Sequence, residues 1–160
     1  MFGFMKKNKR EELIAVVDGE LISMEEVDDP VFSQKMMGDG FAIKSTGDTI
    51  YACADAVVSV VFPSNHAVGL TLDNGMEILI HIGIDTVEEN GKGFTSFCEQ
   101  GKRVSKGDKL ISFDRTYLES KGYDLTTIVI FTKKDSYKEF KRENVREVKG
   151  GETIAVTYTI

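Results

Sequence analysis

Short apolar runs recur about once every dozen residues, and this regular spacing is the feature that most constrains the fold. Turn residues separate many of the runs, glycine is abundant (15 residues) and proline is scarce (2 residues). Such runs are typical of β-strands. Many short strands joined by glycine-rich turns indicate an all-β fold, an antiparallel β-sandwich or barrel. We predict strands at Leu13–Val17, Glu20–Met24, Phe41–Lys44, Thr49–Cys53, Val57–Phe62, Val68–Leu72, Met76–Ile82, Lys109–Phe113, Thr127–Phe131 and Thr153–Thr159.

Helices are expected to be few and short. Asp29 followed by Pro30 has the pattern of a helix N-cap and first-turn proline, and Gly38 is placed to end that helix. One or two helical turns are also predicted at each of Phe94–Glu99, Tyr117–Lys121 and Tyr137–Arg142.

Two internal repeats indicate a doubled architecture. The stretch beginning AVVDGELI at Ala15 matches ACADAVVS at Ala52, and VSKGDKL at Val104 matches VKGGETI at Val148. The second pair is typical of a turn that leads into a new strand. Chance similarity between strand–turn–strand segments explains both matches equally well.

Length and composition favour one cytoplasmic domain. A chain of 160 residues suits a single domain, which we place at residues 13–160 after a flexible tail, residues 1–12. MFGFMKKNKR lacks the order of a secretion signal, and a weak membrane-surface anchor is the alternative to a polar tail. No apolar run is long enough to span a membrane. Cys53 and Cys98 form no CxxC pair, which suits a reducing compartment, and the net charge of −6 disfavours nucleic-acid binding.

The two histidines are predicted to meet in space. Asn74-Gly75 is a strong signal for a two-residue hairpin turn. Counting outward pairs Val68 with His81 and places His66 opposite Gly83, so the two imidazoles lie diagonally on one face. Ile78, Ile80 and Ile82 are then expected on the opposite face from Leu79, His81 and Gly83.

Two adjacent imidazoles allow three interpretations. A neutral imidazole is a good nucleophile that can carry a phosphoryl group, while its neighbour donates to the phosphoryl oxygens. Paired imidazoles also suit zinc, although no HxH or HExxH spacing supplies further ligands. The third interpretation is two polar residues on a solvated sheet. Gly83 would leave open space for a docked protein, Asp85 could orient an imidazole, and Ser64 could fix the tautomer of His66.

Three blocks of sequence resemble a known family. SNHAVGLTLDNGMEILIHIGIDTVEENGKGF, DDPVFSQKMMGDGFAI upstream and GKRVSKGDKLISFD downstream are similar to the glucose-type IIA proteins of the bacterial phosphoenolpyruvate-dependent sugar phosphotransferase system. The matching order runs from Leu13 to Ile154, nearly the whole chain. The resemblance implies a compact β-sandwich built on a duplicated motif and a phosphoryl carrier that works at the inner face of the membrane.

The resemblance also implies roles for individual residues. His81 matches the phosphorylated histidine, which is charged by the histidine-containing phosphocarrier protein (HPr). His66 matches the second histidine, which supports transfer to the cysteine of a sugar-specific IIB domain of the permease, and Ser64 matches a threonine that orients it. The residues that match the rim of the docking face are Asp29, Val31, Phe32, Phe62, Leu79 and Asp85. No cofactor is required, although zinc could bind between His66 and His81.

This sequence departs from the family pattern in its turns. The Ala-Pro-x-x-Gly elements of the family lack both prolines here, and Ala56 replaces one glycine, which would strain a positive φ. KGYDLTTIVI also lacks the usual proline. A zinc hydrolase on a related fold and a regulatory docking protein remain as alternatives. A IIA protein does not bind the sugar, so the sequence does not identify the sugar, the IIB partner or any regulatory target. We expect a free-standing subunit.

Overall fold

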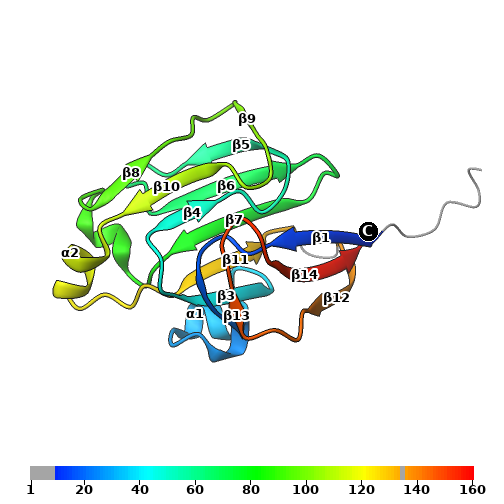
Figure 1. The fold of residues 1–160 in the computed structure, drawn as a ribbon, viewed down its shortest axis with the longest axis horizontal. Helices are drawn as coiled ribbons and strands as arrows, with labels where there is room; N and C mark the ends of the chain where they lie inside the picture. The colour runs from blue at the N-terminus through cyan, green and yellow to red at the C-terminus, as the bar shows by residue number, and fades with distance from the viewer. Residues whose placement is uncertain (1–9, 134–135) are drawn as a thin grey trace, which may run out of the picture.

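A computed structural model describes residues 10–133 and 136–160 of the chain (Figure 1). Residues 1–9 of the expected flexible tail lie outside the described residues. Residues 10–12, assigned to that tail, instead begin strand β1 (Arg10–Ile14), which pairs along its length with β14 (Ile154–Thr159).

The architecture is an antiparallel β-sandwich, as the sequence predicts. An eight-stranded sheet has the order β13-β2-β3-β11-β7-β6-β5-β9. Its pairings are antiparallel throughout. Its strands are β2 (Gly19–Ser23), β3 (Gly40–Ser45), β5 (Ala56–Val61), β6 (Ala67–Leu72), β7 (Glu77–Ile82), β9 (Arg103–Val104), β11 (Thr127–Phe131) and β13 (Glu147–Val148).

Two three-stranded sheets, β1-β14-β12 and β4-β10-β8, pack against one face of the large sheet (Figure 1). They contain β4 (Thr49–Tyr51), β8 (Phe94–Ser96), β10 (Lys109–Phe113) and β12 (Lys138–Arg142). The main core lies between the layers, where side chains of the small sheets meet Val68, Ile80 and Val129 of the large one. A second apolar cluster covers the opposite face of the large sheet, and this cluster carries the candidate site.

Two of the four predicted helices are confirmed and two are wrong. Asp29 caps α1 (Pro30–Ser33) by accepting a hydrogen bond from the backbone of Val31, as its position before proline indicates. The predicted end at Gly38 is wrong, because the helix ends at Ser33 with Gln34 as its C-cap. The helix α2 (Arg115–Ser120) covers most of the helical segment predicted at Tyr117–Lys121. The segments predicted as helical at Phe94–Glu99 and Tyr137–Arg142 instead contain the strands β8 and β12. Short 3₁₀ turns occur at η2 (Met24–Glu26) and η3 (Thr86–Glu89).

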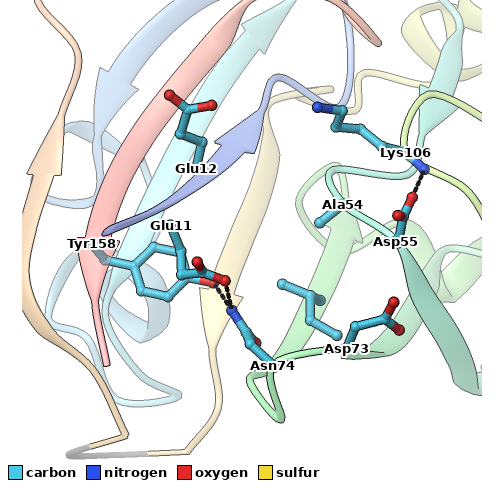
Figure 2. A pocket seen from close by; sticks show the side chains of 9 residues that line it. Glu11, Glu12, Ala54, Asp55, Asp73, Asn74, Lys106 and Tyr158 are labelled. Atoms are coloured by element: carbon cyan, nitrogen blue, oxygen red, sulfur yellow. Dashed lines mark hydrogen bonds between the residues drawn. The ribbon is translucent and has the colours of Figure 1, made fainter. Parts of the chain in front are cut away.

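The internal repeats correspond to repeated structure. Asp18 accepts a hydrogen bond from the amide of Gly150, and Asp55 makes the equivalent contact with Lys106 (Figure 2). The next turn repeats as well, because the amides of Gly151 and Gly107 donate to the carbonyls of Ala15 and Ala52. The equivalent strands also pair alike: Gly19 lies opposite Val148, and Ala56 lies opposite Val104. Chance similarity does not account for these matched contacts, and Ala56 is not among the residues with positive φ.

The hairpin that carries the histidines differs from its prediction by one residue. Thr71 pairs with Glu77 and Ala67 pairs with His81, so the turn contains three residues and not two. Gly75 takes the left-handed conformation (φ 92°) that this turn requires. The side chain of Asn74 accepts from the Met76 amide and donates to Glu11 and Tyr158, which anchors the tip (Figure 2).

The burial pattern explains why the observed register is favoured. Val68, Leu70 and Leu72 are buried in the main core together with Ile78 and Ile80. The two-residue turn would turn the apolar residues of β6 away from that core, because a shift of one residue moves every side chain of a strand to the other face. On β7 the predicted alternation is confirmed, since Ile78, Ile80 and Ile82 face the core while Leu79 belongs to the opposite cluster.

Candidate functional site

His81 lies near the end of β7, on the outer face of the large sheet. Its ring Nδ1 is 2.9 Å from the carbonyl oxygen of Gly83. A carbonyl can only accept a hydrogen bond, so Nδ1 carries the proton and donates. In the neutral ring, Nε2 therefore holds the free lone pair.

His66 reaches His81 although it occupies the opposite strand parity. Its backbone carbonyl accepts from the amide of Ile82, which by alternation would turn its side chain toward the core. However, His66 precedes the first residue of β6 and follows Asn65, whose φ is 55°. In this turn the strand alternation does not hold, and the two imidazole centroids lie 5.0 Å apart with ring planes at 84°.

Ser64 contacts the second histidine directly. Its hydroxyl oxygen lies 2.6 Å from Nδ1 of His66. When the hydroxyl donates, the proton of the neutral imidazole is on Nε2, which leaves an N–H available for a ligand. The ring of Phe62 packs edge to face against that of His66, with the centroids 5.5 Å apart.

Burial keeps both imidazoles neutral near pH 7. His66 is only 4% exposed. Burial, followed by the charge of His81, lowers the pKa of His66 from 6.5 to about 4. Burial also lowers the pKa of His81, while the hydrogen bond to Gly83 and the charges of Asp29 and Asp85 oppose that shift. His81 is therefore neutral at rest. The carboxylates of Asp29 and Asp85 lie near enough to stabilise a positive charge on its ring when one forms.

An apolar cluster surrounds the pair. The ring of Phe32 lies 5.1 Å from that of His81. Phe32 and Leu79 are both less than 10% exposed, so they form the floor of the site and not its accessible rim. Val31 is 41% exposed, and Asp85 is exposed as well. The buried members of the cluster are Ile22, Met24, Val27, Phe32, Ala42, Ala67, Leu79, Ile128 and Ile130.

Gly83 has a different role from the one predicted. The sequence predicts open space at Gly83, opposite His66, and this prediction is wrong. His66 lies opposite Ile82, and a Cβ on Gly83 would lie 2.6 Å from the Thr86 methyl group. Gly83 has a φ of 78° and supplies the carbonyl that binds Nδ1 of His81. The spacing of a histidine and a glycine two residues later is the only sequence signal for this contact.

The turn after His81 is fixed from two sides. Asp85 (φ 62°) precedes η3, and the hydroxyl of buried Thr86 donates back to the carbonyl of Ile82. At the end of η3, the carboxylate of Glu89 accepts hydrogen bonds from the hydroxyls of Tyr117 and Tyr123. These contacts hold both Gly83 and Asp85 next to the imidazole.

The site offers two nitrogen donors for a metal ion. In residues 10–133 and 136–160 there is no group of three or more histidine, cysteine, aspartate and glutamate side chains that could hold one. A tetrahedral zinc site uses four ligands, or three and a water. The described part of the chain therefore supplies only part of such a set.

Comparison with known proteins identifies the family. The sequence model of the family described as phosphoenolpyruvate-dependent sugar phosphotransferase system, EIIA 1, matches residues 11–137. The chain belongs to this family. As an EIIA protein it is a phosphotransferase component, a phosphocarrier in sugar uptake.

Similar EIIA proteins match along almost the whole chain. The glucose-specific EIIA component of Staphylococcus epidermidis is 39% identical over 161 residues, covering 100% of this chain and 97% of that protein. That of Haemophilus influenzae is 37% identical, covering 98% and 94%. The glucose permease IIA of Mycoplasma capricolum has the same fold, with a TM-score of 0.86, 37% identity and coverage of 94% and 96%.

In another relative the EIIA region is part of a larger protein. The glucose-specific EIICBA component of Streptococcus pneumoniae is 42% identical over 137 residues, which are 86% of this chain and 19% of that protein. EIIA proteins thus work with permease components. The helices in the described part of this EIIA chain are all too short or too polar to cross a membrane.

Proposed function

We propose that this EIIA protein carries its phosphoryl group on Nε2 of His81, accepting it from phosphorylated HPr and passing it to the cysteine of a IIB domain. The hydrogen bond from Nδ1 to Gly83 is the observation that carries the proposal, because it leaves Nε2 as the only nucleophilic nitrogen. The lowered pKa of His81 keeps that nitrogen unprotonated near neutral pH.

The first step exchanges one nitrogen–phosphorus bond for another. The Nε2 lone pair of His81 attacks phosphorus, and the bond to the donor histidine breaks with its electron pair returning to the donor ring. The ring of His81, still protonated at Nδ1, then carries positive charge. The Gly83 carbonyl and the charges of Asp29 and Asp85 stabilise this charge, as their opposing effects on the pKa of His81 indicate.

His66 acts on the phosphoryl oxygens. Ser64 donates to Nδ1 of His66, so the Nε2–H of His66 is free to donate to an oxygen of the phosphoryl group on His81. The short distance between the rings, 5.0 Å, allows one small group to contact both. In the second step a IIB thiolate attacks phosphorus, and the electron pair of the broken bond returns to His81.

Partner proteins dock on the surface around the histidines. Its accessible rim is formed by Asp29, Val31, Phe62 and Asp85, above the floor of Phe32 and Leu79. An apolar surface edged by carboxylates suits partners with an apolar patch and basic residues, so we expect association to weaken with added salt. The protein then works in the cytoplasm, at the inner face of the membrane when it meets the permease. The names of its relatives favour a glucose-class sugar.

Zinc binding is a second candidate function. The observation that favours it is the close imidazole pair, whose neutral rings are suitable zinc ligands. Because the described residues add no third donor, zinc would need ligands from a regulatory partner protein. We propose that the phosphoryl transfer itself requires no cofactor.

A two-step assay with purified partners tests the roles of the two histidines. His66→Gln should still take a phosphoryl group from HPr but pass it poorly to a IIB domain, because the nucleophile His81 is intact while the imidazole donor that Ser64 orients is replaced by a flexible amide. His81→Gln should accept none. If His66→Gln instead accepts no phosphoryl group, or passes it on as well as the unmodified protein, the assigned role of His66 is wrong.

A further inference from the structure

The peptide group between Gly83 and Ile84 connects His81 to a second segment of the chain. On one side its carbonyl oxygen accepts from Nδ1 of His81. On the other side its N–H donates to the carbonyl of Asp124, at 2.9 Å. The orientation of this peptide group determines where the proton of the His81 ring is held.

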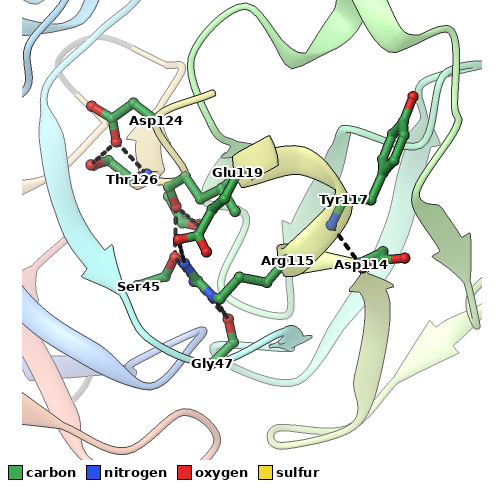
Figure 3. Close-up of polar contacts among 10 residues, drawn as sticks. Ser45, Gly47, Asp114, Arg115, Tyr117, Glu119, Asp124 and Thr126 are labelled. Carbon is green, nitrogen blue, oxygen red and sulfur yellow. Dashed lines mark hydrogen bonds and ion pairs between the residues drawn. The ribbon is translucent and has the colours of Figure 1, made fainter. Parts of the chain in front are cut away.

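The side chain of Asp124 shapes the segment that holds this peptide group. Its Oδ1 accepts from both the amide (2.9 Å) and the hydroxyl (2.8 Å) of Thr126, as Figure 3 shows. The turn formed in this way presents two backbone carbonyls to the chain after His81. That of Asp124 binds Ile84, and that of Thr126 binds the amide of Gly83 at 3.0 Å.

Contacts from β3 and α2 hold the same segment in place. The hydroxyl of Ser45 donates to the carbonyl of Leu125, at 2.7 Å. Arg115 donates in turn to Ser45 and to the carbonyl of Gly47 (Figure 3). These contacts fix Leu125. The carbonyls of its neighbours Asp124 and Thr126 are therefore held in place against the amides of residues 84 and 83.

We propose that Asp124 is a positioning residue for phosphoryl transfer at His81, acting through the Gly83–Ile84 peptide group. This inference rests on the proposed function of His81. Hydrogen bonds in series polarise one another, so the bond from Ile84 to Asp124 makes the Gly83 carbonyl a stronger acceptor. A stronger acceptor keeps the proton on Nδ1 and stabilises the positive ring that forms when Nε2 takes the phosphoryl group.

Nitrogen NMR of the unphosphorylated protein tests the positioning role without any transfer reaction. Asp124→Ala removes the acceptor for Thr126, and we expect part of the neutral His81 ring to move its proton from Nδ1 to Nε2. Asp124→Asn keeps an oxygen that can accept, so it should retain the original tautomer. Asp108→Ala is the matched control, because Asp108 makes the same kind of contact, to the amide of Ser105, in the turn before β10.

Single-turnover kinetics with phosphorylated HPr provide the second readout. Asp124→Ala should lower the rate of transfer at saturating HPr about tenfold. This is the low end of the losses found when the hydrogen-bond partner of a metal-binding histidine is removed. The concentration of HPr at half-saturation should not change, because Asp124 does not lie on the docking rim. If Asp124→Ala does not fold, Thr126→Val removes one of the two bonds and should shift the tautomer and rate in the same direction, but less.

The outcomes separate the two proposals. Unchanged ring signals in Asp124→Ala, or an equal change in Asp108→Ala, overturn the positioning role. A tautomer change confined to the Asp124 and Thr126 variants, together with slower transfer, supports it. If the tautomer changes but the unmodified protein accepts no phosphoryl group, Asp124 still positions the ring proton, and the proposed function is contradicted.

Discussion

His66 and His81 lie edge to face, with ring centroids 5.0 Å apart, although the pairing of β6 with β7, continued to His66, would place the two side chains on opposite faces. The turn at Asn65 (φ 55°) brings His66 onto the face of His81 just before β6 begins. The pair is asymmetric, since Nδ1 of His81 donates to a carbonyl while Nδ1 of His66 contacts a hydroxyl. This asymmetry suits one nucleophile and one donor.

The first prediction concerns stability as a function of pH. The pKa of His66 falls from 6.5 to about 4 on folding, so between these values the unfolded chain binds a proton that the folded protein does not. The free energy of unfolding therefore rises with pH across this range and falls on acidification. Denaturant unfolding from pH 4 to 7 should show a smaller slope for His66→Gln than for the unmodified protein. An identical slope would contradict the lowered pKa.

The second prediction concerns Ser64. Ser64→Ala should reduce transfer to the IIB domain about fivefold, the loss expected for one hydrogen bond of about 1 kcal/mol that orients His66. Ser64→Thr keeps the hydroxyl and should restore most of the rate. Ser96→Ala removes a hydroxyl that contacts Cys98, away from the histidines, and serves as the control. A loss in that control as large as in Ser64→Ala would show that the effect is not specific to the site.

A third prediction compares two glycines that both have positive φ. Gly83→Ala adds a Cβ that would lie 2.6 Å from the Thr86 methyl group, whereas Gly75→Ala meets nothing within 4 Å. Both substitutions cost about 1–2 kcal/mol of backbone strain, and Gly83→Ala adds the cost of overpacking, about 1–3 kcal/mol. Thermal unfolding should show the difference, and only Gly83→Ala should also slow phosphoryl acceptance. Equal melting temperatures would argue against the close packing at Gly83.

The fourth prediction separates the floor of the site from its rim. Phe32 is 6% exposed and packs on His81, so Phe32→Ala should destabilise the protein by about 3–5 kcal/mol. Val31 is 41% exposed, and Val31→Ala should change stability by less than about 0.5 kcal/mol. Val31→Ala should nevertheless weaken HPr binding in titration calorimetry. Unchanged HPr affinity would remove Val31 from the docking rim.

The positions of the strands along the sequence could be predicted more completely than the way in which the strands pair. All ten predicted strands overlap observed ones, because apolar periodicity reports burial directly. β12 was mistaken for a helix because the five residues of KEFKR include one half-buried side chain, Phe140, and its pairing with β14 is a long-range contact. The equivalent contacts of Asp18 and Asp55 show that the repeats were informative.

The site was predicted through a pairing that is itself incorrect. The sequence predicts that a two-residue turn places His66 and His81 on one face. Burial of the apolar side chains of β6 instead requires a three-residue turn, and the bend at Asn65 then brings His66 back to His81. Asp124 could not be identified from the sequence, because it acts through backbone carbonyls that carry no side-chain signal.

Intact mass spectrometry after incubation with phosphoenolpyruvate, enzyme I and HPr tests the central claim most directly. We predict a single acid-labile phosphate adduct on the unmodified protein and none on His81→Ala, with His66→Gln still modified. Circular dichroism confirms that each variant is folded, and a known EIIA protein in the same mixture confirms that the donors are active. Equal labelling of folded His81→Ala, or no adduct on the unmodified protein beside a labelled control, would contradict the account.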